Sequence, residues 1–424
     1  MSRRPAPGYN GLSLKDRAAL GASSQAGLGW MDGGPTLSSL SICPVQLHKR
    51  RPLDRLDEPP STEIVLGADT SSQPMQLSTP ILLNGYSSLF FGAPDRKALG
   101  MGASLSGTAL LVGEGPILPE EKELFNKIST KTVPQWDSGR IGMDANVLGS
   151  ASAVEIRLGN GTSGGVESFI PASRLSESWA ANIGHPRGID YYKPGYHLDM
   201  ERPADLLNHV ELLREVTSHR APVLVRLSPG DVAKDIKLAL SARADGIILD
   251  VDPAGNGAVW ENCERSVGIP VLPAVSSARV ALDRARREGK GPDVPLLVNC
   301  DVRNGGDVFK LIALGANAVI IGTAAQIVMG CTECGKCHLG RCPVGLATHD
   351  TELQAVVDME TSGEFVGGLV DAMTDELSQA MAVAGREELA DITLDDIRAL
   401  TYDAAAVTGA PLAGLGRSLP MWEY

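Results

Sequence analysis

From about residue 76, short and largely apolar runs recur along the chain, each bounded by Gly, Pro, Asn or Asp. Most of them lack alternation of apolar and polar positions, which is typical of strands that are buried on both faces, as in parallel sheets. The runs lie at residues 80–83, 109–112, 153–158, 222–227, 246–250, 270–273, 295–299 and 318–322. We therefore predict eight parallel strands in the core of this chain.

Stretches of helical length separate several of these runs. They lie at residues 95–106, 204–217, 232–243, 277–288 and 306–314. Strands that alternate with helices over roughly 270 residues have the count and length of a (β/α)₈ barrel, the α/β fold also called the TIM barrel. A doubly wound open sheet is the alternative, but no Gly-rich dinucleotide fingerprint follows the first run.

The segments on either side of the repeating pattern differ from it. Residues 1–75 are rich in Pro, Gly, Ser and charge, with a possible short helix at 14–20, and we expect an extended arm. The barrel is assigned to residues 76–350, and the long stretch between residues 159 and 222 should carry loops over its mouth. Residues 351–424 are predicted to form a helical extension, in which Thr393 caps a helix start.

Composition narrows the classes of function. The 424 residues are 43% hydrophobic and 21% charged, as in ordinary globular proteins. The net charge of −13 disfavours nucleic acid as a partner. No apolar run approaches a membrane span, and the N-terminus lacks the apolar core of a secretory signal. The scattered Cys43, Cys263 and Cys300 argue against a disulfide framework, so we expect a cytoplasmic protein.

The most specific chemical signal is a run of cysteines, because four of the seven fall within a dozen residues. They are Cys331, Cys334, Cys337 and Cys342, in a Gly-rich loop that is closed by a proline. This spacing of thiolates indicates iron–sulfur ligation. Zinc sites usually pair two separated Cys-x-x-Cys units, and only one run is present here. A zinc knot and a chance cluster of buried thiols remain the alternatives.

A second candidate site lies at the ends of the last two strands. In a (β/α)₈ barrel the site forms at the C-terminal ends of the strands, and the last two loops often bind phosphate. Here the seventh run leads to Gly305 and Gly306, and the eighth ends at Gly322 and Thr323. Their amides would bind a phosphate such as that of FMN, although ordinary tight turns carry the same residues. The cysteine run begins eight residues after Thr323, within electron-transfer reach of a flavin.

Charged residues also interrupt the apolar runs. Arg226 lies near the end of its run, where it would bind a flavin pyrimidine or an anionic group. A salt bridge to Asp250 or Glu155 is the alternative reading. Glu155 and Arg157 alternate with apolar positions, so one pair of side chains in this run must face the barrel interior.

These motifs resemble the central domain of glutamate synthase large subunits from about residue 80 to 352. The resemblance rests on the cysteine loop, on Asn-Gly-Tyr-Ser-Ser at 84–88, on Val-Gly-Glu-Gly at 112–115 and on Ser-Gly-Arg-Ile-Gly at 138–142. In that family three cysteines, here Cys331, Cys337 and Cys342, hold a [3Fe-4S] cluster. Cys334 is additional, which leaves a [4Fe-4S] cluster open.

The resemblance implies a barrel that carries FMN and an iron–sulfur cluster, and that reduces an imine of 2-oxoglutarate to glutamate or an N-substituted glutamate. It implies a hetero-oligomer with separate amidotransferase-like, β-helix-like or electron-donor subunits. The expected catalytic residues are Glu114, Arg226 and Asn256. The expected cofactor-binding residues are Gly85, Tyr86, Ser87, Arg226, Gly305, Gly306, Gly322 and Thr323.

The chain departs from the family pattern at two loops. The family's lysine after the strand at 153–158 is Ser163 here, and the Gly-rich loop around Asn256 is reduced. The loss of a lysine removes a candidate acid or anion clamp. A non-catalytic electron-transfer or scaffold subunit is therefore the alternative function. A zinc-stabilised barrel that binds a phosphorylated metabolite is a third possibility.

Overall fold

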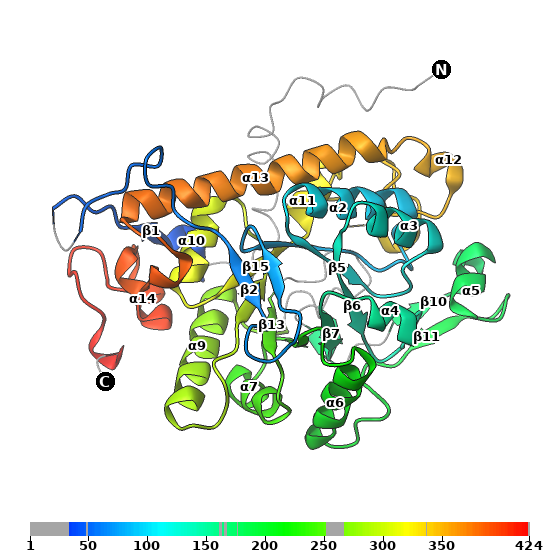
Figure 1. The fold of residues 1–424 in the computed structure, drawn as a ribbon, viewed down its shortest axis with the longest axis horizontal. Coiled ribbons are helices and arrows are strands. Elements are labelled where there is room, and N and C mark those ends of the chain that lie inside the picture. Colours follow the sequence, from blue (N-terminus) through cyan, green and yellow to red (C-terminus); the bar gives the residue numbers. More distant parts are fainter. Residues whose placement is uncertain are drawn as a thin grey trace.

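The centre of the computed structural model is a closed barrel of eight parallel strands (Figure 1). The described residues are 34–47, 50–160, 163–164, 168–175, 177–251, 267–335 and 337–422. Neighbouring barrel strands follow one another in chain order, and the last pairs with the first. The strands are β4 (Ile81–Asn84), β5 (Ala109–Gly113), β6 (Lys131–Trp136), β7 (Val154–Arg157), β12 (Val223–Leu227), β13 (Gly246–Asp250), β14 (Leu296–Asn299) and β15 (Ala318–Ile321). The predicted (β/α)₈ barrel is confirmed, and the open sheet is excluded.

Helices follow the strands and cover the outside of the barrel. The longer ones bury an apolar stripe; in α7, for example, Val232, Ile236, Ala239 and Leu240 recur at helical spacing. The helices are α2 (Ala93–Leu105), α3 (Pro119–Lys127), α4 (Ala145–Gly149), α6 (Leu206–Val216), α7 (Val232–Ser241), α9 (Val271–Arg287), α10 (Gly305–Ala313) and α11 (Thr323–Val328).

Two strand assignments from the sequence change. The run at 270–273 is the start of α9, with Pro270 as its N-cap and Pro273 in the first turn, where a missing amide costs little. A short apolar run alone does not distinguish a buried strand from a buried helix. The strand missed in the sequence is β6, which contains Pro134; its pairing with β5 is shifted between Leu111 and Gly113.

The lower half of the barrel interior is apolar and is closed by a hairpin. Side chains from the barrel strands, among them Leu82, Val133, Leu224, Ile248 and Leu297, form one buried cluster. The hairpin of β2 (Ile64–Leu66) and β3 (Met75–Leu77) adds its apolar face to this cluster. The opposite end, where the strands terminate, is therefore the end that can hold a site.

The C-terminal region lies across the outer helices. The long helix α13 (Met359–Ala384) packs on α2, α10 and α11, and α12 (Thr351–Gln354) precedes it (Figure 1). Strand β16 (Ile397–Ala399) pairs with β1 (Leu40–Ile42) from the N-terminal region, and α14 (Tyr402–Thr408) follows. Thr393 caps only a single 3₁₀ turn (Leu394–Asp396), because the chain then extends into β16. The possible helix at 14–20 lies outside the described residues.

Within the described part of the chain, no helix combines the length and apolar character needed to cross a membrane.

Candidate functional site

A polar ring lies directly above the apolar layer of the barrel interior. Side chains alternate along a strand, so the residue two positions after an inward-facing apolar side chain also faces inward. By this rule Asn84 faces inward because Leu82 does, and Asp250 faces inward because Ile248 does. The ring consists of Asn84, Gln135, Glu155, Arg157, Arg226, Asp250 and Asn299, which form the floor of the barrel mouth.

Arg226 lies at the centre of this ring and is only 2% exposed. Its Nε donates to Asp250 Oδ2 at 2.8 Å, and its Nη1 lies 3.3 Å from Glu155 Oε2. Burial by itself lowers the pKa of Arg226, but the two carboxylates outweigh burial and raise it above its ordinary value. The ion-pair reading of Arg226 is thus confirmed, and its charge is compensated within the fold.

The ring also contains acceptors that the described residues leave unsatisfied. The side-chain amide of Asn299 donates to Asp250 at 2.5 Å, and Arg157 bonds to Asp250 and to Gln135. Among the described residues, Asn299 Oδ1 and Glu155 Oε1 are buried without a hydrogen-bond partner. Buried polar atoms in native proteins are almost always satisfied. These two oxygens therefore point to a ligand at the barrel mouth.

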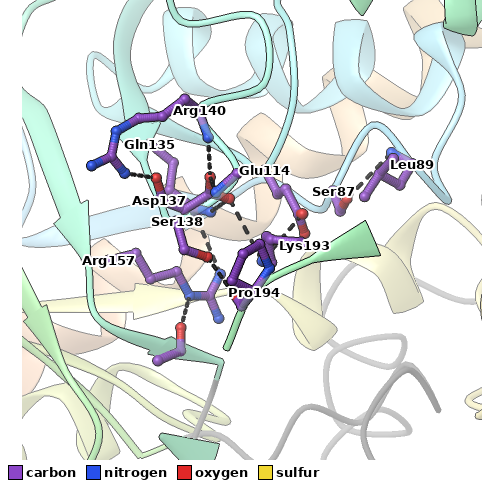
Figure 2. A network of polar contacts seen from close by, with 12 residues as sticks. Ser87, Leu89, Glu114, Gln135, Asp137, Ser138, Arg140, Arg157, Lys193 and Pro194 are labelled. Carbon is purple, nitrogen blue, oxygen red and sulfur yellow. Dashed lines mark hydrogen bonds and ion pairs between the residues drawn. The ribbon is translucent and has the colours of Figure 1, made fainter. Parts of the chain in front are cut away.

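The rim of the mouth carries a second group of charges, which Figure 2 shows converging. Lys193 Nζ lies 3.1 Å from Glu114 Oε1 and 3.6 Å from Asp137 Oδ2. Glu114 follows the end of β5, and Asp137 follows β6. Burial raises the pKa of Glu114; Lys193 opposes this rise and Asp137 adds to it. Glu114 thus lies at the mouth, where the sequence analysis expected a catalytic residue.

Lys193 was not singled out in the sequence. It ends β11 (Tyr191–Lys193), which pairs with β10 (Ser168–Ile170) in the long stretch after β7. Its partners lie 56 to 79 positions away in the chain, so no local motif marks it. The only signal was the excess length of that stretch, which indicated loops over the mouth.

Tyr86, Gly322 and Thr323 of the predicted flavin site come together. A β-carbon on Gly322 would lie 2.8 Å from the Tyr86 hydroxyl. Thr323 is the first residue of α11, whose first-turn amides have no intrahelical acceptor. Gly85 is explained by packing, because a β-carbon there would collide with the Leu111 carbonyl. Ser87 lies beside them and accepts a hydrogen bond from the Leu89 amide at 3.2 Å.

The structure corrects the prediction for Gly305. Its amide donates to a carboxylate oxygen of Glu376 at 2.8 Å, and α13 leaves no room for a β-carbon. The N-terminus of α10 therefore already has an internal anion, which its dipole favours. Asn304 caps this helix, because its side chain accepts a hydrogen bond from the Asp307 amide. Gly306 faces β1, where Ile42 lies 3.8 Å from its β-carbon position.

Three of the four clustered cysteines gather beside the flavin loop. Cys331, Cys337 and Cys342 lie in one apolar group with Phe91, and Tyr86 stacks on Phe91 at 4.5 Å. Cys334 is exposed. The Glu333 amide donates to Cys331 Sγ at 3.4 Å, a contact typical of cluster-binding loops.

The thiols of this loop lie close enough to affect one another. Burial raises the pKa of Cys331 to about 11 and that of Cys337 to about 12, and the neighbouring thiols add to both shifts. Without a cation the thiols stay protonated, whereas a bound metal deprotonates a coordinating thiol. The donor set therefore fits a metal centre.

A histidine group beside the rim has metal-ligating chemistry but another explanation. The ligand atoms of His197, Asp199 and His209 lie within 4.8 Å of one another. The Arg140 guanidinium, however, bonds to His197 Nδ1 at 2.7 Å and to Asp199 at 2.9 and 3.0 Å. His197 Nε2 bonds to the Arg157 carbonyl at 2.8 Å. A cation already occupies the centre of this group, which anchors the rim.

One residue of the predicted catalytic set, Asn256, lies outside the described residues. Ser163 belongs to β9 (Ser163–Gly164), whose backbone pairs with β8 (Gly159–Asn160) just above β7.

Comparisons with known proteins identify an oxidoreductase on a (β/α)₈ barrel. The family model described as the conserved region in glutamate synthase matches residues 46–387. The chain therefore belongs to the glutamate synthase family. It is 31% identical over 422 residues to the glutamate synthase large subunit-like protein of Rhizobium meliloti, covering 96% of this chain and 94% of that relative.

A second relative is longer than the chain. The archaeal glutamate synthase (NADPH) of Methanocaldococcus jannaschii is 32% identical over 312 residues, which cover 73% of this chain and 60% of that protein.

Solved structures share the fold alone. A lactate oxidase from Pediococcus acidilactici has a TM-score of 0.55 at 16% identity, covering 92% of this chain and 95% of the other. A mandelate oxidase with (S)-2-phenylpropionate has a TM-score of 0.53 at 17% identity, covering 90% and 96%.

Proposed function

We propose that this chain is an FMN and iron–sulfur oxidoreductase subunit that reduces an imine of 2-oxoglutarate to glutamate or an N-substituted glutamate. Family membership gives the reaction class. The observation that carries the proposal is the placement of the cysteine group. Through Phe91 and Tyr86 it adjoins the barrel end that holds the polar ring and the unsatisfied acceptors. A flavin and a cluster bound there would be neighbours.

The residues at the mouth fit FMN. Asn299 Oδ1 and Glu155 Oε1 are buried acceptors for the polar edge of a flavin ring. The Tyr86 hydroxyl and the first-turn amides of α11 are donors for its phosphate. When bound, reduced FMN supplies the hydride that reduces the substrate. Arg226 would hold the polar ring of side chains in place through its ion pairs with Asp250 and Glu155, and it would not bind substrate directly.

Glu114 is the proposed proton donor. As hydride reaches the imine carbon, the π electrons of the C=N bond become a lone pair on nitrogen. That lone pair takes the proton of the Glu114 carboxyl, which is left as a carboxylate. Burial raises the pKa of this carboxyl, which favours the protonated form that a general acid needs. Asn256 completes the proposed catalytic set.

The cysteine group would hold a [3Fe-4S] cluster through Cys331, Cys337 and Cys342. Cys334 is exposed and is not part of their apolar group, but its thiol lies close enough to raise the pKa of Cys331 and Cys337, so a four-cysteine [4Fe-4S] site is the alternative. The cluster would relay electrons between the flavin and a donor subunit. We further propose a cytoplasmic hetero-oligomer in which amidotransferase-like, β-helix-like or electron-donor subunits act with this barrel. Residues 1–75 and 351–424 would form its arm and its helical extension.

The test uses the protein with its cofactors and partner subunits. A reduced donor should bleach the flavin absorbance, and 2-oxoglutarate with ammonia or methylamine should restore it while glutamate or N-methylglutamate forms. If no amine restores the absorbance, the barrel does not turn over this substrate class. The alternative, an electron-transfer or scaffold subunit, is favoured by the internal pairing of Arg226 and by Ser163 in place of a lysine.

A further inference from the structure

Lys193 is held over the barrel mouth by a rigid anchor. Tyr191, two residues before Lys193, packs edge-on against Trp179 with ring centroids 5.8 Å apart. The following residue, Pro194, accepts a hydrogen bond through its carbonyl from the Ser138 hydroxyl at 2.5 Å. The Lys193 side chain is 7% exposed, so its ammonium group has little freedom to leave its partners. Its position is fixed by the fold and not by the two carboxylates alone.

The two carboxylates depend on Lys193 to different degrees. Asp137 accepts hydrogen bonds from the amides of Gly139 and Arg140 at 2.9 and 3.1 Å and from the Gln135 side chain at 3.2 Å. In the part of the chain that the structure describes, the Glu114 carboxyl has no polar partner other than Lys193. Asp137 is thus stabilised as an anion by several donors, whereas Glu114 relies on one ammonium group.

We infer that Lys193 is a positioning residue, whose ammonium group aims the Glu114 carboxyl at the barrel mouth and compensates the charge that forms on Glu114 when its proton is transferred. The inference rests on the proposed function for the identity of the proton acceptor. By this inference the stretch after β7 takes part in the chemistry and also covers the barrel mouth.

The charge balance of the step supports this role. Before transfer, a neutral Glu114 faces Lys193 and the anionic Asp137, a set with no net charge. After transfer, the Glu114 carboxylate lies opposite the ammonium group at 3.1 Å. Without Lys193, the new carboxylate would face Asp137, and the cation left near it would be Arg157, which is shared with Asp250 and Gln135; Tyr191 nearby stays neutral. A buried pair of like charges opposes the release of the proton.

The test compares Lys193→Met, which removes the charge, with Lys193→Arg, which keeps it. Lys310→Met is the matched control, because Lys310 pairs with Asp307 at 3.3 Å on α10, away from the mouth. In the flavin- and iron-loaded complex, Lys193→Met should lower the rate at least about tenfold and move the alkaline limb of its pH profile upward by about one to three pH units. Lys193→Arg should restore the limb, and Lys310→Met should not move it.

A second measurement does not depend on turnover. Burial already raises the pKa of Glu114 above 4.5 in the wild type, and without Lys193 it rises further. The unfolding free energy of Lys193→Met should therefore fall relative to the wild type once the pH passes the wild-type folded pKa of Glu114. Lys193→Arg should show no such trend. An unmoved alkaline limb, or a Lys193→Met stability difference independent of pH, would overturn the inference. A wild type that reduces no imine would refute the proposed function, while the stability comparison would still decide whether Lys193 controls the charge of Glu114.

Discussion

Asp95 provides a sharp test of the packing between α2 and α11. It is 1% exposed, its Oδ1 accepts a hydrogen bond from the Gln326 side chain at 2.8 Å, and its Oδ2 is buried without a partner among the described residues. Burial raises the pKa of this carboxyl from 3.8 to about 7, against the opposing effects of Gln326 and Arg96. The folded protein therefore favours the protonated form of Asp95.

The magnitude follows from linkage. The folded and unfolded pKa values differ by roughly three units, which corresponds to about 4 kcal/mol at 1.36 kcal/mol per unit. Because the folded protein has the higher pKa, protonated Asp95 contributes fully to the free energy of unfolding below about pH 4. This contribution is lost as the pH rises from about 4 to about 7, where the folded protein must ionise a buried carboxyl. Above that range the loss is complete.

The perturbation is Asp95→Asn, which keeps the shape and leaves an oxygen that can accept from Gln326. Urea unfolding of the wild type and the variant should be measured from pH 4.5 to pH 8. The variant should gain about 3 kcal/mol relative to the wild type across this range, on top of a constant offset. Asp371→Asn, at an exposed position on α13, is the control and should show no trend. A variant-to-wild-type difference that is flat with pH would refute the buried, protonated Asp95.

Three further predictions concern the site. Cys337→Ser should strip iron while flavin stays bound, whereas Cys334→Ser should retain iron, both measured by metal analysis and absorbance; equal iron loss in the two variants would contradict a three-cysteine site. Glu114→Gln should lower the imine-reduction rate by about 10²- to 10⁴-fold with unchanged flavin content, so a wild-type rate would exclude proton transfer from Glu114. Gly322→Ala should weaken FMN binding, because the β-carbon would lie 2.8 Å from the Tyr86 hydroxyl; unchanged affinity in a flavin titration would argue against a phosphate site there.

The barrel could be predicted because its information is local. Seven of the eight strands appear as apolar runs, since a strand that is buried on both faces needs little else. β6 escaped because Pro134 and polar residues interrupt it. The run at 270–273 was misassigned because apolar helix starts and apolar strands look alike over four residues.

The polar ring was partly predictable for the same reason. Alternation along β7 predicted that one pair of its side chains faces inward, and the structure shows that this pair is Glu155 and Arg157. The same rule applied to β14 would have added Asn299. Lys193 and Glu376 were beyond reach, because each meets its partner only through tertiary packing. Lys193 arrives from a hairpin that folds back over the rim, and Glu376 arrives when α13 docks on α10. Spacing could not distinguish Cys334 from its neighbours, whereas the structure shows that it is the exposed one of the four.

The central claim is that one end of this barrel holds a flavin next to an iron–sulfur cluster. Anaerobic purification followed by a visible spectrum, flavin extraction and metal analysis tests it most directly. We predict a coloured protein with about one FMN and about three iron atoms per chain. A colourless protein with zinc and no flavin would contradict the account.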